Sequence, residues 1–346
     1  MRAGMRRVMR VKKNISNMSQ NTANTNGSLL KVEELKTYFA IKKGLLRRTV
    51  GYVRAVDGVS FEVAQGQSLG LVGESGCGKT TIARSIIRLV PATSGRITFG
   101  QTDILSANKR QLREIHRQIS LIFQDPYSSL NPRLTVGDII GEPLKYQKGV
   151  GGKQLTAKIA ELLSKVGLSP EHINRYPHEF SGGQRQRIGV ARALSMGPQL
   201  VICDEPVSAL DVSIQSQILN LLKDLQEEFG LTYLFIAHDL AVVEFFCDVI
   251  AVMYMGRIVE QADSEELYKN PLHPYTRVLM SAIPQIGAGR GKKEGLGGEV
   301  PGMSQIPQGC PFHPRCSVAD SDCLKQMPGL KEAGEGQGHL VSCWKC

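Results

Sequence analysis

The sequence has no long uninterrupted apolar run. Its longest apolar region extends from Leu231 to Met255, and it is interrupted by His238, Asp239, Glu244 and Asp248. A membrane-spanning helix needs roughly 20 predominantly apolar residues. We therefore expect a soluble chain, whose association with a membrane would depend on a partner protein.

Acidic residues are missing from the start of the chain. Six of the first 13 residues are basic, and a polar stretch from Asn14 to Ser28 follows them. This stretch lacks the apolar core of a secretory signal. We predict a disordered tail over residues 1–28, with attraction to anionic lipid as the alternative. The rest of the chain is only mildly basic although the net charge is +10, so no nucleic-acid partner is expected.

Internal repeats and sustained heptads are also lacking, which excludes a solenoid and a long coiled coil. Short apolar strands instead alternate with helical patterns, and this predicts a mostly parallel α/β core. Two runs of alternating polarity, Leu29–Tyr38 and Val53–Val63, predict an antiparallel β subdomain. Residues 126–197 predict an inserted α-helical subdomain, with a break at Pro143 and further breaks at later glycine and proline residues.

A glycine-rich segment lies between the apolar strand Ser68–Val72 and the helical pattern of Thr80–Leu89. It fits the pattern G-x-x-x-x-G-K-S/T in the strand–loop–helix context that this pattern requires. The backbone N–H groups of such a loop face phosphate oxygens, while the lysine contacts the β- and γ-phosphates and the hydroxyl binds Mg²⁺. The candidate ATP-binding residues are Gly73, Glu74, Ser75, Gly76, Cys77, Gly78, Lys79, Thr80 and Thr81.

A second apolar strand, Leu200–Cys203, ends in two acids. Asp204 suits the Walker B role, in which a carboxylate holds Mg²⁺ through its water shell. Glu205 can accept a proton from an attacking water. Two acids at a strand end could also cap the next helix, but the phosphate loop in the same chain favours the catalytic interpretation.

A further helix start lies between these two elements. Ser181 is a good N-cap, and Gly182 and Gly183 leave the first N–H groups of the helix open to an anion. On this evidence alone it could be an ordinary helix start. Its position before Asp204 favours a functional interpretation.

Taken in their order along the chain, these segments and four single residues resemble the motifs of the ATP-binding cassette (ABC) family. The glycine-rich loop resembles Walker A, Leu200–Glu205 resembles Walker B, and Ser181–Gln184 resembles the signature, formed by Ser181, Gly182, Gly183 and Gln184. Single residues resemble four other motifs: Gln124 the Q-loop, Asp211 the D-loop, His238 the switch histidine and Tyr38 the aromatic that stacks on adenine. The resemblance covers residues 29–285 and implies a P-loop NTPase core.

The resemblance implies a shared active site. Two such domains pair head to tail, and each ATP lies between Walker A of one chain and the signature of the other, so that ATP drives domain closure. Glu205, His238 and Gln124 would then be catalytic. Tyr38, Gln124 and Asp204 would join the loop residues in binding ATP, and Mg²⁺ would be held by Thr80, Gln124 and Asp204.

Three stretches resemble the ATPases of oligopeptide/dipeptide importers: Ile41–Arg48, Phe123–Arg133 and Leu267–Thr276. This resemblance implies a peripheral subunit at the cytoplasmic face of the cell membrane that hydrolyses ATP to power peptide uptake. Its implied partners are a second homologous ATPase subunit in a heterodimer, two membrane permease subunits and an extracytoplasmic substrate-binding protein. Relatives carry dipeptides, longer peptides, glutathione, nickel chelates or sugars, so the substrate stays open.

Cysteines crowd into the end of the chain, after a Gly- and Lys-rich linker, in an extension over residues 286–346. Four thiolates could hold either zinc or an iron–sulfur cluster: Cys310, Cys316, Cys323 and Cys343. The resemblance to family members with such a tail implies a 4Fe-4S cluster, and Zn²⁺ and free thiols remain the alternatives. His313 and His339 are alternative ligands, whereas Cys346 is not expected to be one.

A non-transport ABC ATPase that acts on ribosomes or DNA is the rival interpretation. Such proteins commonly carry two cassettes or a long coiled-coil insertion. This sequence shows one cassette, a short insert and no sustained heptads, which favours the transport subunit.

Overall fold

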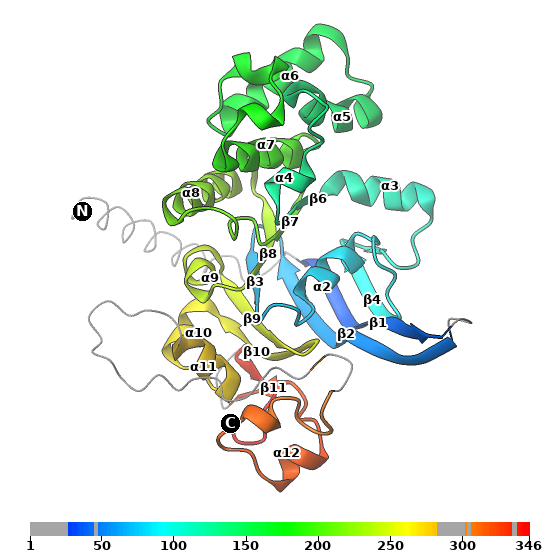
Figure 1. Cartoon of the computed structure of the whole chain (residues 1–346), viewed down its shortest axis with the longest axis vertical. Coiled ribbons are helices and arrows are strands. Elements are labelled where there is room, and N and C mark those ends of the chain that lie inside the picture. The colour runs from blue at the N-terminus through cyan, green and yellow to red at the C-terminus, as the bar shows by residue number, and fades with distance from the viewer. Residues whose placement is uncertain (1–26, 45–47, 282–301, 303–305, 334–337) are drawn as a thin grey trace, which may run out of the picture.

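The computed structural model describes residues 27–44, 48–281, 302, 306–333 and 338–346. In this part of the chain the strands form two sheets, with helices around them (Figure 1). The expected tail over residues 1–28 lies almost wholly outside the described residues, and so does the expected linker from Gly287 to Gly298.

The larger sheet has the strand order β11-β12-β10-β9-β3-β8-β7-β6 among the described residues. Strands β9, β3, β8, β7 and β6 run parallel to one another, and the remaining three extend the β9 edge in antiparallel pairing. The α/β core expected from the sequence is therefore confirmed. The strand bounds are β3 (Ser68–Val72), β6 (Ile119–Ile122), β7 (Leu200–Asp204), β8 (Thr232–Ala237), β9 (Val249–Tyr254), β10 (Arg257–Asp263), β11 (Lys331–Glu332) and β12 (Leu340–Val341).

The smaller sheet is antiparallel and has the order β2-β1-β4-β5 in the described chain. Its two long strands extend several residues beyond the alternating runs that predicted them, because pairing continues outward along the hairpin. The bounds are β1 (Ser28–Lys43), β2 (Arg48–Ala64), β4 (Ser94–Phe99) and β5 (Thr102–Asp103).

Most of the helices lie around the larger sheet. Helices α5, α6 and α7 gather at the end opposite the C-terminal segment, residues 306–333 and 338–346 (Figure 1). None of the helices in the described ranges is long and apolar enough to cross a bilayer. The bounds are α2 (Lys79–Ile86), α3 (Lys109–Gln118), α4 (Pro126–Ser129), α5 (Val136–Lys148), α6 (Gly152–Lys165), α7 (Gly182–Leu194), α8 (Val212–Phe229), α9 (Leu240–Phe246), α10 (Ser264–Lys269), α11 (Pro274–Ser281) and α12 (Ser321–Lys325).

The helix break predicted at Pro143 is wrong, because α5 continues through this residue. A proline inside a helix costs about 3 kcal/mol or more, since it removes a hydrogen bond and crowds the preceding turn. Ile139, Ile140 and Leu144 of the same helix are at most 3% exposed and pack into the core. Burial of this face offsets the local cost.

The C-terminal segment is attached to the larger sheet at two places. Strand β12 pairs with β10 at Glu260 and Gln261. Phe312, which is 1% exposed, packs its ring against Tyr254 and Tyr275 with centroids 5.3 and 5.4 Å away. These contacts place the end of the chain against β10 and β9, on the side of the sheet where β9 adjoins β3.

Candidate functional site

Four neighbouring parallel strands end at the same edge of the larger sheet. The glycine-rich loop follows β3, Gln124 lies two residues after β6, Asp204 ends β7 and His238 follows β8. Crevices outside the carboxyl ends of parallel strands are where open α/β sheets bind their ligands. Sheet topology thus brings together residues that lie up to 165 positions apart, from Gly73 to His238.

The glycine-rich loop wraps around the ammonium group of Lys79. Nζ donates to the carbonyl oxygen of Gly73 at 2.7 Å and to that of Glu74 at 3.0 Å. Gly78 has a φ of 112°, and a Cβ there would lie 2.1 Å from the carbonyl oxygen of Ala55. Gly78 also precedes α2, whose N-terminus has no side-chain cap among the described residues. Its first N–H groups can therefore receive phosphate oxygens.

Two of the three candidate magnesium ligands are paired: Thr80 in the first turn of α2 and Asp204 at the end of β7. Thr80 Oγ1 donates to Asp204 Oδ1 at 2.8 Å. Asp204 is 4% exposed, and burial raises the pKa of its carboxyl group, while the hydrogen bond from Thr80 acts in the opposite direction. A hydroxyl and a carboxylate beside a phosphate loop are oxygen donors of the kind that Mg²⁺ prefers.

Glu205 is the point where the three candidate catalytic residues meet. Gln124 Nε2 donates to Glu205 Oε2 at 3.0 Å, and His238 Nδ1 lies 3.1 Å from the same oxygen. The backbone of Glu205 has a φ of 48°, a left-handed conformation that costs a non-glycine residue energy and is found at functional sites. This arrangement can orient a carboxylate to accept a proton from water.

Gln124 was also expected to bind Mg²⁺. Its amide nitrogen is bonded to Glu205, while Asp204 is bonded to Thr80. The structure therefore brings Gln124 into the catalytic group, and its role toward the metal stays a prediction.

Ser181 begins α7 in the manner that the sequence predicted. Its hydroxyl accepts from the backbone N–H of Gln184 at 3.4 Å, and the Gln184 side chain accepts from the backbone N–H of Ser181 at 3.0 Å. This reciprocal pair is a capping box. Both bonds join Ser181 to Gln184, and neither reaches the phosphate loop of the same chain.

Two further candidate residues lie on separate elements. Tyr38, on β1, donates its hydroxyl to Asp57, and burial together with this contact raises the pKa of the phenol. Asp211 precedes α8 and is exposed. Adenine stacking by Tyr38 and the D-loop role of Asp211 therefore stay predictions.

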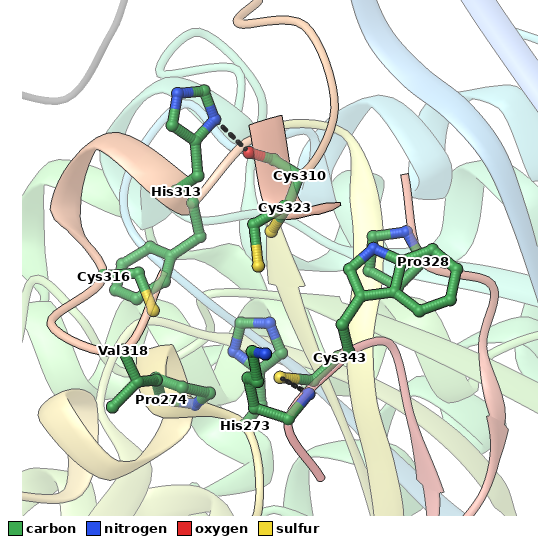
Figure 2. A pocket seen from close by; sticks show the side chains of 12 residues that line it. His273, Pro274, Cys310, His313, Cys316, Val318, Cys323, Pro328 and Cys343 are labelled. Carbon is green, nitrogen blue, oxygen red and sulfur yellow. Dashed lines mark hydrogen bonds between the residues drawn. The ribbon is translucent and has the colours of Figure 1, made fainter. Parts of the chain in front are cut away.

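Four cysteines of the C-terminal segment line one cavity (Figure 2): Cys310, Cys316, Cys323 and Cys343. The thiols of Cys316, Cys323 and Cys343 point toward the central space of this view. Burial raises the pKa of the Cys310 thiol to about 11. Within the described residues, no group of three or more His, Cys, Asp or Glu side chains is placed to hold a metal ion.

The alternative ligands are not equivalent. His313 lines the cavity, but its Nδ1 lies 2.9 Å from the carbonyl oxygen of Cys310 and its ring points away from the thiols (Figure 2). His339 lies elsewhere, with Nε2 2.8 Å from Glu260 and Nδ1 3.6 Å from Glu266. Cys346 is exposed and is not among the residues that line the cavity.

Sequence reasoning missed two contacts of the phosphate loop. The hydroxyl of Tyr275 accepts from the backbone N–H of Glu74 at 3.0 Å, and Arg315 forms an ion pair with the Glu74 side chain at 3.0 Å. No local pattern around Tyr275 or Arg315 signals a partner some 200 residues earlier. Only the folded structure, in which both residues lie beside Glu74, reveals these two contacts.

Two family models match different regions of this chain. A model described as ABC transporter matches residues 56–208, and a model described as oligopeptide/dipeptide transporter, C-terminal region, matches residues 259–323. The second match includes Arg315 and three of the four cavity cysteines, and it ends before Cys343.

Similar proteins span nearly the whole chain. The oligopeptide transport ATP-binding protein AppF of Bacillus subtilis is 50% identical over 326 residues, which cover 93% of this chain and 98% of that protein. OppF of Salmonella typhimurium, with the same description, is 50% identical over 323 residues, covering 92% and 96%.

Two solved structures share the fold. CbiO1 of Clostridium perfringens, part of the ABC transporter complex cbiONQ, has a TM-score of 0.60 and 27% identity, covering 70% of this chain and 91% of that one. The ATP-binding cassette MJ0796, dimeric and bound to ADP and Pi in a post-hydrolysis state, also has a TM-score of 0.60 and 27% identity, covering 68% and 98%.

Proposed function

Because this chain belongs to the oligopeptide transport ATP-binding proteins of the ABC transporter family, we propose that it hydrolyses ATP to power peptide uptake. The observation that carries the proposal is the meeting of Gln124 and His238 on Glu205, beside the Thr80–Asp204 pair. The candidate phosphate-binding, metal-binding and proton-accepting groups thus lie at one sheet edge, which supports the proposal.

In the proposed reaction, water attacks the γ-phosphate of ATP and ADP leaves, without a covalent intermediate. Glu205 accepts a proton from the water at its carboxylate, and Gln124 and His238 orient that carboxylate. Lys79 and the first N–H groups of α2 bind the phosphates. Thr80 and Asp204 would hold Mg²⁺, which offsets the charge of the phosphates when it is bound with ATP.

The site is completed by a second chain in this proposal. Ser181 to Gln184 present a helix N-terminus, and their bonds to each other do not reach this chain's loop. The similar cassette MJ0796 is dimeric in its post-hydrolysis state. We propose that the signature of this chain acts on the nucleotide of a homologous partner in a heterodimer, with two permeases and a substrate-binding protein completing the importer at the cytoplasmic face of the membrane.

For the cysteine-lined cavity we propose a 4Fe-4S cluster rather than Zn²⁺. Four thiols line one space, although no group of three or more His, Cys, Asp or Glu side chains in the described chain is placed to hold a metal ion. Zinc would need four ligands at about 2.0–2.3 Å from one atom, whereas a cluster spreads its four thiolates over four irons. Anaerobic purification followed by iron and sulfide analysis tests this, and iron-free, zinc-loaded protein would reverse the order.

Phosphate release and peptide uptake test the main proposal together. The full chain with its co-purifying membrane partners should hydrolyse ATP, and deletion of its gene should abolish uptake of labelled peptides. Co-purification with ribosomes or DNA in place of membrane permeases would favour the rival non-transport function.

A further inference from the structure

One arginine of the C-terminal segment reaches the phosphate loop. Arg315 ends the short 3₁₀ turn η3 (His313–Arg315), between Cys310 and Cys316. Its Nη1 donates to Glu74 Oε2 and its Nη2 donates to Glu74 Oε1, both at 3.0 Å. Such a bidentate contact fixes the orientation of both groups. The two residues are 241 positions apart in the sequence.

The ion pair is largely removed from water. The Arg315 side chain is 4% exposed and that of Glu74 is 20% exposed. Nε of Arg315 is buried without a hydrogen-bond partner among the described residues. Burying a guanidinium in this way adds little stability compared with an apolar side chain, so the pair is better explained by the conformation that it fixes.

Glu74 is held by its backbone as well as by its side chain. Its N–H donates to the Tyr275 hydroxyl at 3.0 Å, and its carbonyl oxygen accepts from Lys79 Nζ at 3.0 Å. A shift of Glu74 would therefore shift a hydrogen-bond partner of the lysine that binds phosphate. The C-terminal segment thus touches the loop one contact away from Lys79.

The charge of Glu74 would also oppose nucleotide binding. It is the second residue of a loop that must receive the multiply negative phosphates of a nucleotide. An unpaired carboxylate at this place would repel them, and the lower polarity of a partly buried site strengthens the repulsion relative to bulk water. Arg315 supplies the opposite charge and turns the carboxylate toward the C-terminal segment.

We infer that Arg315 is a positioning residue of the nucleotide site, which neutralises Glu74 and holds the phosphate loop in the conformation that binds nucleotide. The C-terminal segment thereby controls the affinity for nucleotide. Arg315 touches Glu74 and does not take part in the reaction. The inference rests on the proposed function, because it assumes that the loop binds nucleotide.

Calorimetric titration of the full chain with Mg·ADP tests this role. Arg315→Gln should raise the Kd about tenfold, the lower range for loss of a charged hydrogen-bonded pair. Arg315→Lys, which keeps the charge but cannot form the bidentate contact, should raise the Kd by a smaller factor, about threefold. In the double variant with Glu74→Gln the repelling charge is gone, so most of the lost affinity should return. Lys325→Gln is the matched control, since it removes one exposed charge from the same segment.

Two further readouts separate positioning from a merely structural role. The effect of Arg315→Gln should shrink at high salt, because repulsion by Glu74 is screened. With ATP, the variant should raise KM while kcat stays within about twofold. Thermal unfolding without nucleotide identifies a variant that fails to fold, and Arg315→Lys then carries the test.

An unchanged Kd in Arg315→Gln would overturn the inference, and so would a loss that Glu74→Gln does not recover. Failure of the natural chain to bind Mg·ADP would instead refute the proposed function. The two failures are therefore distinguishable in one titration series.

Discussion

The two acidic residues at the end of β7 and the C-terminal segment serve the candidate nucleotide site in different ways. Asp204 and Glu205 are adjacent in sequence, and the buried strand that carries them sets their position. Arg315 comes from a segment held by the short strand β12 and by Phe312. The first region lies on a strand with a paired neighbour on each side, and the second is held at the opposite edge of the sheet.

This difference predicts different consequences of damage. Loss of a β7 carboxylate should remove chemistry and leave the fold intact, because the strand is held by its neighbours on both sides. Loss of the C-terminal anchor should release a whole segment and weaken nucleotide binding indirectly. Four substitutions test this contrast.

Glu205→Gln should have the largest effect. The amide cannot accept the proton from water, and general-base catalysis contributes about 10²–10⁴-fold to a rate. Phosphate release measured over time should fall by that factor, while the Kd for Mg·ADP and the unfolding midpoint stay unchanged. Hydrolysis at the normal rate would remove Glu205 from the mechanism.

Phe312→Ala should destabilise the C-terminal segment by about 3–5 kcal/mol, the usual cost of emptying a buried aromatic site. Urea unfolding measures this change, and Mg·ADP affinity should fall with it because Arg315 loses its support. Leu324→Ala is the control, since Leu324 is 50% exposed on the same segment. Nucleotide affinity that survives release of the segment would show that the two regions are independent.

Lys79→Ala should weaken Mg·ADP binding by roughly 10- to 100-fold, because hydrogen bonds to charged groups contribute about 1.5–3 kcal/mol. Lys109→Ala, at an exposed position of α3, serves as the charge-matched control. Equal affinities of the two variants in a fluorescent-nucleotide titration would contradict the phosphate-loop assignment.

Ser181→Ala should have the smallest effect on the single chain. Loss of the N-cap costs about 1 kcal/mol of stability, which urea unfolding can detect. Its own Mg·ADP affinity should stay constant, whereas turnover in the paired complex should fall. A single chain that loses ADP affinity on this change would indicate that Ser181 serves its own loop.

Most of the site could be predicted because its residues lie in short contiguous patterns. Gly73–Thr80, Asp204–Glu205 and the Ser181 cap each combine residue types and spacing that only a few local structures use. Strand–helix alternation then predicts that the strand ends meet at one edge. Sequence reasoning therefore identified the residues that converge on Glu205.

The contacts that sequence reasoning missed are long-range ones. Arg315 and Glu74 carry no shared pattern, and their pairing depends on how β12 and Phe312 position the end of the chain. The continuation of α5 through Pro143 has a similar cause, since tertiary burial outweighs the local penalty of proline. In both cases packing between distant segments decides the structure.

The ion pair between Arg315 and Glu74 also has a consequence for synthesis. A ribosome adds roughly 5–20 residues per second, so the 241 positions between the two residues correspond to a delay on the order of 10–50 s. During that time the emerging phosphate loop carries an uncompensated carboxylate. A growing chain would therefore bind nucleotide weakly until its C-terminal segment docks. Because this segment is translated last, an incomplete subunit would be slow to pair with its partner subunit.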